Sequence, residues 1–583
     1  MREITRQKGE RQSSRSWESA NSNQRRSSVL NWPTAISGRL LLAIERHAHL
    51  VLVGMLVLYA LILFGGLTFK YVHWGQGYDQ IDYQQSIWNT TQGRFLEISH
   101  YRHTDHLWGM DFIPAIVLLV PFYALFPSAL TLNFFQAVFM ALGAWPVYGI
   151  ARDRFDNSRL AGIGWAAIYL LYPSLWFVTM SAPWQPRTLA IPALLGAFYM
   201  LQQHRWAWCM ALLALALTTR TDVSLVVCMF GILAGLWRMG WRWVLPPLLL
   251  GLAWFYVSTS VIVPAFYRDD YQPQAGAIGQ SYDETWPGTS PQLAYYSHLG
   301  NSTGEIVRTI VTRPVKVAQL MLTPPKLTYL VLMLLPLAFL PLLAPDVALL
   351  ASPIIAMNLL STRVFQYTIR EQYQALVIPG LVLAAIIGGA RLWRWWVARR
   401  SHQEVARHAA RGDEGETPTL PGAMSGVRHE ASSHPRILAS SHPRLFASAY
   451  LLAGFVLYAL VINMLLKNPV VTTILYREEP ARIALMEEMR TMVPPDASLA
   501  VTSFLAPRMM PRRYIYYLPH GPMFPPLERA EYLFMDTRAS ALQGSDFVAR
   551  IRAAPEWEIV VDADDLLLVR QTSYNDEQAL DRQ

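Results

Sequence analysis

The chain has 583 residues, of which 53% are hydrophobic and only 15% are charged, whereas soluble domains carry about a quarter. This composition excludes an ordinary soluble globular protein. The chain has only two cysteines, Cys209 and Cys228, which is too few for a disulfide framework. The formal net charge of +8 does not indicate nucleic-acid binding, because the surplus lies in two short segments beside apolar stretches.

The first of these basic segments is the N-terminal tail, residues 1–46, with nine Lys/Arg against four Asp/Glu. An uncharged apolar run at 50–69 follows, and it is long enough to cross a bilayer core of ~30 Å. The run is too long and too far from the N-terminus for a cleavable signal peptide. We therefore expect a signal anchor that leaves the tail in the cytoplasm.

The loop after this run is long and rich in aromatic and histidine residues. Asp79 and Asp82 would share one helical face at a spacing of three residues. A partly shielded carboxylate there could act as a general base, so both are catalytic candidates. The alternative is that they only cap a helix or face solvent. The cluster HYRHTDH at 100–106, with His106, resembles a metal site but lacks a fixed helical spacing. We assign no metal ligand and keep a divalent cation only as an alternative.

Residues 109–127 are apolar enough to span, but they begin near Asp111 and contain three prolines. If this segment does not span, the basic loops at 152–159, 204–205 and 237–243 fall on the cytoplasmic side with the N-terminal tail. If it spans, every later loop inverts, contrary to the positive-inside rule. We therefore expect an interfacial or re-entrant segment within an external loop at 70–128.

These patterns predict an all-α polytopic membrane protein of about eleven transmembrane helices, with a core at 47–391. A basic, disordered cytoplasmic linker is expected at 392–444; it contains the repeat ASSHPRIL and ASSHPRLF. The predicted spans lie at 50–69, 129–150, 160–180, 188–203, 206–219, 221–237, 242–266, 327–345, 346–361, 373–390 and 445–466.

The tail at 467–583 changes character, because it carries 13 Lys/Arg and 17 Asp/Glu. Short strands are expected at 498–502, 513–517 and 531–535, and the segments WEIVV and DLLLV could pair. Helical spacing is present at 481–492 and 541–553. We therefore expect a small external α/β domain.

Several ionisable residues lie at span ends on the expected outer side. They suit a lipid-linked phosphosugar, because an arginine guanidinium forms paired, charge-assisted hydrogen bonds with phosphate. The alternative is ordinary snorkelling at helix ends. The substrate-binding candidates are His106, Asp111, Arg187, Arg220, Asp222, Arg370 and Tyr373.

The stretches YDQIDYQQSIWNTTQG and MDFIPAIVLLVPFYALFP resemble the first part of a family of predicted membrane proteins, domain of unknown function 2079. Later stretches, SAPWQPRTLAIPALLGAFYML, HLGNSTGEIVRTIVTRPVKV and REQYQALVIPGLVLAA, are similar to the same family in order. That family in turn resembles the C superfamily of glycosyltransferases. The resemblance implies that Asp79 holds the acidic position of the first external loop and that Asp82 is an additional carboxylate.

The chain departs from the family pattern at four places. Family members often have histidine at Asp111, His-Pro-Glu at Gln185 to Arg187, Lys-Glu-Asp at Arg220 to Asp222, and histidine at Gln372. Either the substrate differs or activity has been lost. The resemblance implies a plasma-membrane, cell-envelope glycosyltransferase that moves a sugar from a polyprenyl-phosphate donor to an unknown external acceptor. A transporter or flippase, or a non-catalytic scaffold, is the alternative.

Overall fold

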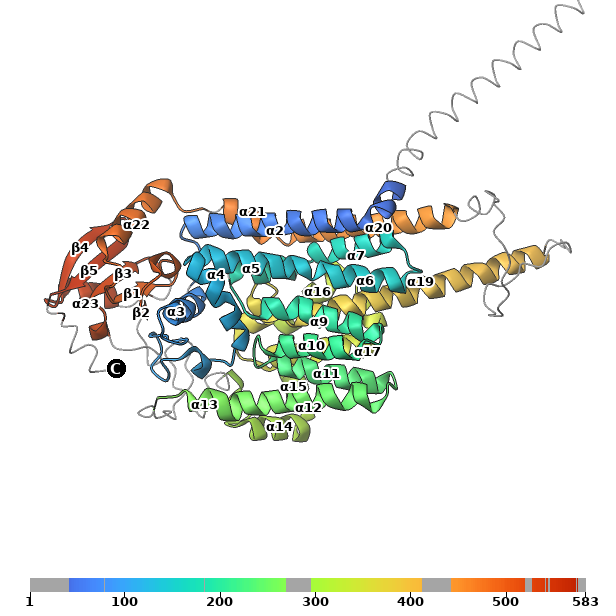
Figure 1. Cartoon of the computed structure of the whole chain (residues 1–583), viewed down its shortest axis with the longest axis horizontal. Coiled ribbons are helices and arrows are strands. Elements are labelled where there is room, and N and C mark those ends of the chain that lie inside the picture. The colour runs from blue at the N-terminus through green and yellow to red at the C-terminus, as the bar shows by residue number, and fades with distance from the viewer. Residues whose placement is uncertain are drawn as a thin grey trace, which may run out of the picture.

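A computed structural model describes residues 41–77, 79–182, 184–268, 295–410, 442–475, 477–518, 527–539, 542–543, 546–572 and 574. Most of these residues form a bundle of helices with long axes close to one common direction, and a small α/β domain lies at one end of it (Figure 1). The last turns of α19 (Val377–Ala410) extend from the opposite end.

The lengths of the apolar helices determine which of them could cross a membrane. Five helices are long and apolar enough to cross a membrane, or up to seven if two bent helix pairs each count as one span. Among the described residues this is fewer than the eleven expected spans, because several apolar segments form helices of only 10–17 residues or break at a bend. The five are Ala48–Val72, Ala129–Arg154, Trp241–Ala265, Val377–Arg400 and Tyr450–Leu475.

The bent pairs have a simple chemical cause. α7 (Arg159–Leu170) and α8 (Pro173–Ser181) meet at 42°, and the apolar pair Pro314–Met321 and Pro324–Leu337 meets at 68°. Proline has no N–H to donate, so it ends one helix and begins the next. The predicted span at 160–180 is therefore a broken helix.

The remaining helices of the bundle range from α13, with three residues, to α2, with 25. They are α2 (Ala48–Val72), α3 (Gln80–Thr91), α4 (Val120–Leu125), α5 (Ala129–Leu142), α6 (Ala144–Arg154), α9 (Arg187–Gln202), α10 (Trp206–Leu217), α11 (Val223–Leu236), α12 (Trp241–Val257), α13 (Val263–Ala265), α14 (Thr303–Thr312), α15 (Pro314–Met321), α16 (Pro324–Leu334), α17 (Pro345–Ala348), α18 (Ser352–Leu360), α20 (His442–Leu465) and α21 (Pro469–Leu475).

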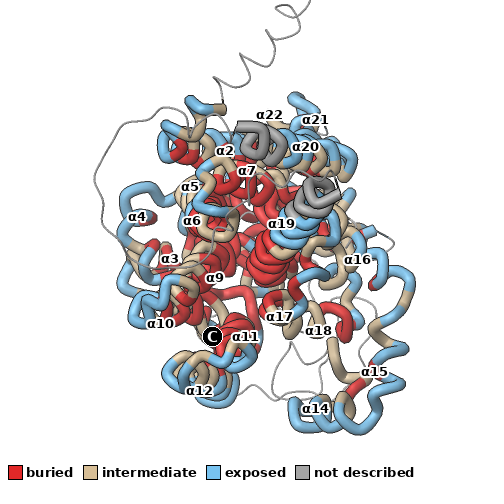
Figure 2. Tube along the Cα trace, turned by 90° about the vertical axis from the view of Figure 1, so that its right-hand side faces the viewer, coloured by how far each residue is buried: buried red, intermediate tan, exposed pale blue. Residues whose placement is uncertain are grey.

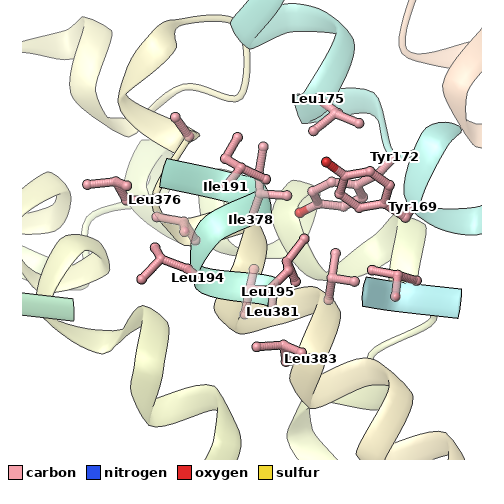
Figure 3. Packing of buried hydrophobic residues seen from close by; sticks show 14 of the residues in the cluster. Tyr169, Tyr172, Leu175, Ile191, Leu194, Leu195, Leu376, Ile378, Leu381 and Leu383 are labelled. Atoms are coloured by element: carbon pink, nitrogen blue, oxygen red, sulfur yellow. The ribbon is translucent and has the colours of Figure 1, made fainter. Parts of the chain in front are cut away.

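Buried residues concentrate in the middle of the bundle, on α7, α9 and the first half of α19 (Figure 2). Leu194, Leu195, Ile378 and Leu381 from α9 and α19 are part of this packing (Figure 3). In the apolar 18-residue stretch of α19, 72% of residues are buried inside the protein. In the corresponding stretch of the helix Trp241–Ala265, only 11% are buried. The outer helices therefore expose apolar surface, as expected where lipid surrounds a protein.

One close approach shows how tightly α19 is packed. A Cβ atom on Gly388 would lie 2.2 Å from the carbonyl oxygen of Leu340, in the 3-10 helix η6 (Leu340–Leu343). Only glycine lets the two backbones come this near. The helix also continues to Ala410, so the expected linker at 392–444 is helical in its first part. Most of the duplicated octapeptide lies outside the described residues.

The segment at 109–127 is not one continuous helix. It forms the 3-10 helix η2 (Pro114–Leu119) followed by α4, and the two together are among the shorter apolar helices. α4 packs against α3. The break follows from Pro114 and Pro121, which cannot donate backbone hydrogen bonds.

The C-terminal domain contains a five-stranded sheet of order β2-β1-β3-β5-β4. β1 (Leu499–Thr502) is parallel to β2 (Ile515–Leu518) and β3 (Tyr532–Asp536), and β5 (Leu566–Gln571) is antiparallel to β3 and β4 (Trp557–Ala563). The helices α22 (Pro480–Met492) and α23 (Phe547–Ala553) accompany it. All five strands lie where the sequence predicts them.

This domain is fixed to the first loop by buried contacts. The Ser99 hydroxyl donates to the Ile515 carbonyl at 2.9 Å and accepts from the Ile515 amide at 3.0 Å, so it extends the edge of β2. Trp74 and Ile81 are buried in the same apolar cluster as Leu499 and Phe534 of the sheet. The sheet therefore holds the loop that carries the candidate site.

Candidate functional site

Charged residues from four separate segments gather at the end of the bundle nearest the sheet. The segments are the turn into α3 with the loop behind it, the turn into α9, the turn between α10 and α11, and the stretch at 361–376. Each segment follows or precedes an apolar helix, so each brings its polar residues to the same end. The structure therefore places most of the sequence-based candidates in one neighbourhood.

Asp79 lies immediately before α3, at its N-cap position. Its Oδ2 accepts a hydrogen bond of 3.0 Å from Nε2 of Gln372. The side chain is exposed, yet protein around it makes desolvation the main cause that raises its pKa, followed by the charge of Asp82. Arg363 and Arg220 oppose this rise. Asp79 is thus a solvent-reachable carboxylate surrounded by other charged groups.

Asp82, one turn along α3, is held by two side chains from the following loop. Its Oδ1 lies 2.6 Å from Nε2 of His100, and the Tyr101 hydroxyl donates to its Oδ2 at 3.3 Å. His100 is fully buried, and its Nδ1 lies 3.1 Å from Oε1 of Gln85. The carboxylate of Asp82 is therefore fixed in orientation.

The neighbours of Gln85 determine where the proton on His100 must be. The backbone amide of Ser99 can only donate, and it lies 3.1 Å from Oε1 of Gln85. The carbonyl of Arg513 can only accept, and it lies 2.5 Å from Nε2 of Gln85. This fixes the amide orientation, so Nδ1 of His100 must donate to Oε1.

The short contact between Asp82 and His100 completes this chain of contacts. One ring nitrogen of His100 lies against Gln85 and the other against Asp82, so the buried ring connects two residues of α3. Buried groups therefore set the orientation of the Asp82 carboxylate beside Asp79.

A second group of charges lies at the turn between α10 and α11. Nε of Arg220 lies 2.8 Å from Oδ2 of Asp111, and Asp111 Oδ1 accepts from the backbone and the hydroxyl of Thr221 at 3.2 and 2.7 Å. The side chains of Arg220 and Asp111 are 21% and 10% exposed. Asp111 therefore ties the first loop to the α10–α11 turn.

Arg187 begins α9 and is 6% exposed. One of its terminal nitrogens, Nη2, forms an ion pair with Oδ2 of Asp222. Its other two nitrogens, Nε and Nη1, have no hydrogen-bond partner within the described part of the chain. Leaving two nitrogens of a buried guanidinium without partners is costly. These nitrogens are suited to an anionic ligand.

Tyr373 connects the guanidinium groups. Nη1 of Arg363 donates to its hydroxyl at 2.5 Å, and the Arg187 guanidinium lies over its ring, 5.7 Å from the centroid. Glu371 lies nearby: desolvation and the charge of Asp79 raise its pKa. The stretch at 361–376 therefore adds an arginine, a carboxylate and an aromatic ring to the site.

Two of the predicted site residues, His106 and Arg370, make none of the contacts described above. His106 stacks on Phe266 at 4.1 Å and accepts a hydrogen bond from the Trp108 amide, away from the residues above. Arg370 is exposed, and it is Arg363 that reaches Tyr373. Within the described ranges no three His, Cys, Asp or Glu residues are grouped as a metal site would require.

Sequence reasoning did not select His100, Gln85, Arg363 or Gln372 as site residues. Arg363 and His100 were visible as polar residues in the right loops, but nothing local distinguished them from Arg370 and His106. Gln372 offered the one usable signal, because it replaces a residue that is often histidine in the resembling family. Its contact with Asp79 joins positions 293 residues apart.

No curated protein matches this chain significantly. Among solved structures, the chain is similar to ArnT from Cupriavidus metallidurans bound to undecaprenyl phosphate, at 13% identity and a TM-score of 0.46, covering 89% of this chain and 97% of that one. The apo structure of the same enzyme matches at 14% identity and a TM-score of 0.43, with the same coverage.

The family comparison is more specific. The model for "Predicted membrane protein (DUF2079)" matches residues 74–407, more than half of the chain. Every residue of the charged site described above, from Asp79 to Tyr373, lies within the matched segment. The chain belongs to the DUF2079 family of predicted membrane proteins.

Proposed function

We propose that this protein is a membrane glycosyltransferase that moves a sugar from a polyprenyl-phosphate carrier to an acceptor hydroxyl. The observation that carries the proposal is that Asp79 lies near Arg220 and Arg363, and that Tyr373 lies close both to this group and to the buried, partly unpartnered Arg187. A sugar transfer of this kind needs a base for the acceptor and cations for the departing phosphate. The site offers both at one end of an apolar bundle.

The chemical step uses Asp79 as the general base. Its carboxylate takes the proton of the acceptor hydroxyl while the acceptor oxygen forms a bond to the anomeric carbon. The bond from that carbon to the phosphate oxygen breaks, and the electron pair leaves with the carrier phosphate. Arg187 would donate to this phosphate from Nε or Nη1, the two nitrogens that Asp222 leaves without a partner among the described residues.

Asp82 has a supporting role in this proposal. Because it is held by His100 and Tyr101, it cannot move freely toward a substrate. Its charge raises the pKa of Asp79, which makes Asp79 a stronger base. Asp111 and Asp222 keep Arg220 and Arg187 in place, and Tyr373 lies against Arg187 and Arg363. Arg370 and His106 stay candidates for the outer parts of the substrate.

The carrier also explains the position of the site. A polyprenyl chain must lie in the apolar layer while its phosphate remains at the interface, and the site lies where the apolar helices end. We propose that this end and the C-terminal domain face away from the cytoplasm. The opposite end carries Arg391, Arg394, Arg399 and Arg400, which agrees with the positive-inside rule.

The direct test of the base is Asp79→Asn in nanodiscs, measured as transfer of labelled sugar from a polyprenyl-phosphate donor. We expect a loss of at least 100-fold, because a positioned base contributes about 10² to 10⁴. Asp156→Asn is the matched control: it is exposed and has a φ of 52°, which asparagine tolerates. Full activity of Asp79→Asn would disprove the assignment.

The orientation is tested separately with single cysteines and a membrane-impermeant maleimide. Gln92→Cys lies on an exposed turn near the site, and Asp156→Cys lies on an exposed turn between α6 and α7. In intact cells we expect Gln92→Cys to be labelled and Asp156→Cys to be protected until the membrane is opened. The reverse pattern would rule out an external site.

Bound lipid separates the alternative functions. The protein purified with native lipid should retain a polyprenyl phosphate detectable by mass spectrometry. A transporter would instead bind its solute, and a scaffold would retain neither.

A further inference from the structure

A pocket that contains neither Asp79 nor Asp82 lies between the first loop, the residues after α13 and the C-terminal sheet. Its volume is about 270 Å³, and four arginines line it: Arg94, Arg268, Arg513 and Arg529. They come from three distant parts of the chain, so only the docking of the sheet on the loop creates the pocket. This volume suits a group the size of a monosaccharide, at the lower end of ligand pockets.

The charges in this pocket are unbalanced toward positive. Two carboxylates, Glu97 and Asp105, face the four guanidinium groups. The Glu97 carboxylate already forms ion pairs, because its oxygens lie 3.2 Å from Nε of Arg513 and 4.0 Å from Nε of Arg94. Nε of Arg268 is buried without a hydrogen-bond partner among the described residues. An anion would neutralise the excess charge and provide that partner.

Aromatic rings supply the second feature. Phe95, Tyr514 and Tyr516 line the pocket, and the Arg513 guanidinium stacks over Tyr514 at 4.8 Å. Tyr516 is buried, which raises the pKa of its hydroxyl, while the positive charges of Arg529 and Arg268 oppose this rise. Flat apolar faces beside cationic donors favour a ring with both apolar and charged edges over a bare ion.

Two consecutive residues, Ser99 and His100, link the pocket to the candidate site. Ser99 lines the pocket, and its hydroxyl binds Ile515 of β2. The next residue, His100, contacts Asp82. A ligand in the pocket would therefore act on the same peptide that orients the Asp82–His100 pair.

We propose that this pocket binds a saccharide that carries a phosphate or carboxylate group, with the anion held by Arg513 and Arg268 and the ring lying against Tyr514. This assignment goes beyond the proposed function and does not depend on it. None of the residues that line the pocket belongs to the carrier site around Arg187.

The experiment is calorimetric titration of the full-length protein in nanodiscs with three probes: glucose 1-phosphate, glucose and inorganic phosphate. We expect saturable binding of glucose 1-phosphate, weaker binding of phosphate and no measurable binding of glucose. Arg513→Gln and Arg268→Gln should each weaken glucose 1-phosphate at least tenfold. Arg550→Gln is the matched control, because Arg550 is an arginine of the same domain with 68% of its side chain exposed.

Tyr514→Ala separates the ring contact from the charge. It should weaken glucose 1-phosphate several-fold while leaving phosphate unchanged, and circular dichroism checks that the sheet is intact. Absence of saturable glucose 1-phosphate binding, unchanged binding in both arginine variants, or displacement by undecaprenyl phosphate would overturn the proposal.

The two proposals can fail independently. Asp79→Asn should abolish transfer and leave glucose 1-phosphate binding intact. Binding without any transfer would reject the glycosyltransferase proposal and keep the pocket.

Discussion

Nε2 of His100 lies 2.6 Å from Oδ1 of Asp82, and Nδ1 of the same ring lies 3.1 Å from Oε1 of Gln85. A buried histidine thus fixes a carboxylate that stands three residues from Asp79. Each of the predictions below depends on one contact of this region or of the helix packing that supports it.

His100→Gln should lower turnover roughly 10- to 100-fold, because misplacing a supporting group by about 1 Å has effects of that size. KM for the donor should change little, since His100 contacts Asp82 and Gln85 and not the phosphate arginines. General damage to the fold would lower both turnover and donor binding, whereas loss of the contact with Asp82 should lower turnover alone. His402→Gln, exposed on α19, is the control.

The pH profile of transfer should report on Asp79. Desolvation and Asp82 raise its pKa, and a base is active only when deprotonated, so activity should fall on the acid side at a higher pH than for an ordinary carboxyl group. Gln372→Leu removes a hydrogen bond that lowers the pKa of Asp79, so the loss of activity in acid should begin at a still higher pH. Asp82→Asn removes a charge that raises this pKa, so the loss of activity should begin at a lower pH. Shifts in the opposite directions would contradict the assignment.

Arg187→Gln should weaken binding of undecaprenyl phosphate about 10- to 100-fold, because hydrogen bonds to a charged group contribute about 1.5–3 kcal/mol. The measurement is a titration in nanodiscs with the lipid at controlled mole fraction. Arg313→Gln, an exposed arginine between α14 and α15, should bind normally. Equal affinity in the two variants would remove Arg187 from the carrier site.

Asp111→Ala should destabilise the protein by about 3 kcal/mol, because it leaves Arg220 without its closest partner in a partly buried position. Thr221→Val, which loses only a hydroxyl bond to Asp111, should cost about 1 kcal/mol. Thermal unfolding in detergent, followed by tryptophan fluorescence, ranks the two. If Thr221→Val proved the more harmful, the ion pair would not be the main tie between loop and turn.

Gly388→Ala should lower the unfolding temperature, since its Cβ would lie 2.2 Å from the Leu340 carbonyl oxygen and overpacking costs about 1–3 kcal/mol. Gly54→Ala, in α2 with no atom within 4 Å of the new Cβ, is the control and should be neutral or stabilising by about 0.5 kcal/mol. A tolerated Gly388→Ala would show that α19 can shift away from η6.

The sequence alone determined the local features of this protein. Apolar runs long enough to span a bilayer, short strand-forming segments in the tail and two carboxylates at helical spacing after the first run are all short-range patterns. They could be predicted because hydrophobic patterns and turn residues act within a few positions. The same patterns predict eleven spans, and within the described residues five helices, or up to seven with the bent pairs, are long and apolar enough to cross a membrane.

The tertiary structure decided which charged residues share a site. Asp79 meets Gln372, Asp111 meets Arg220, and Ser99 meets Ile515, across separations that no local pattern encodes. The packing of helices and the docking of the sheet bring these residues together, and burial then favours hydrogen bonds and ion pairs between them. For this reason Arg363 rather than Arg370 reaches Tyr373, although the two are equivalent in the sequence.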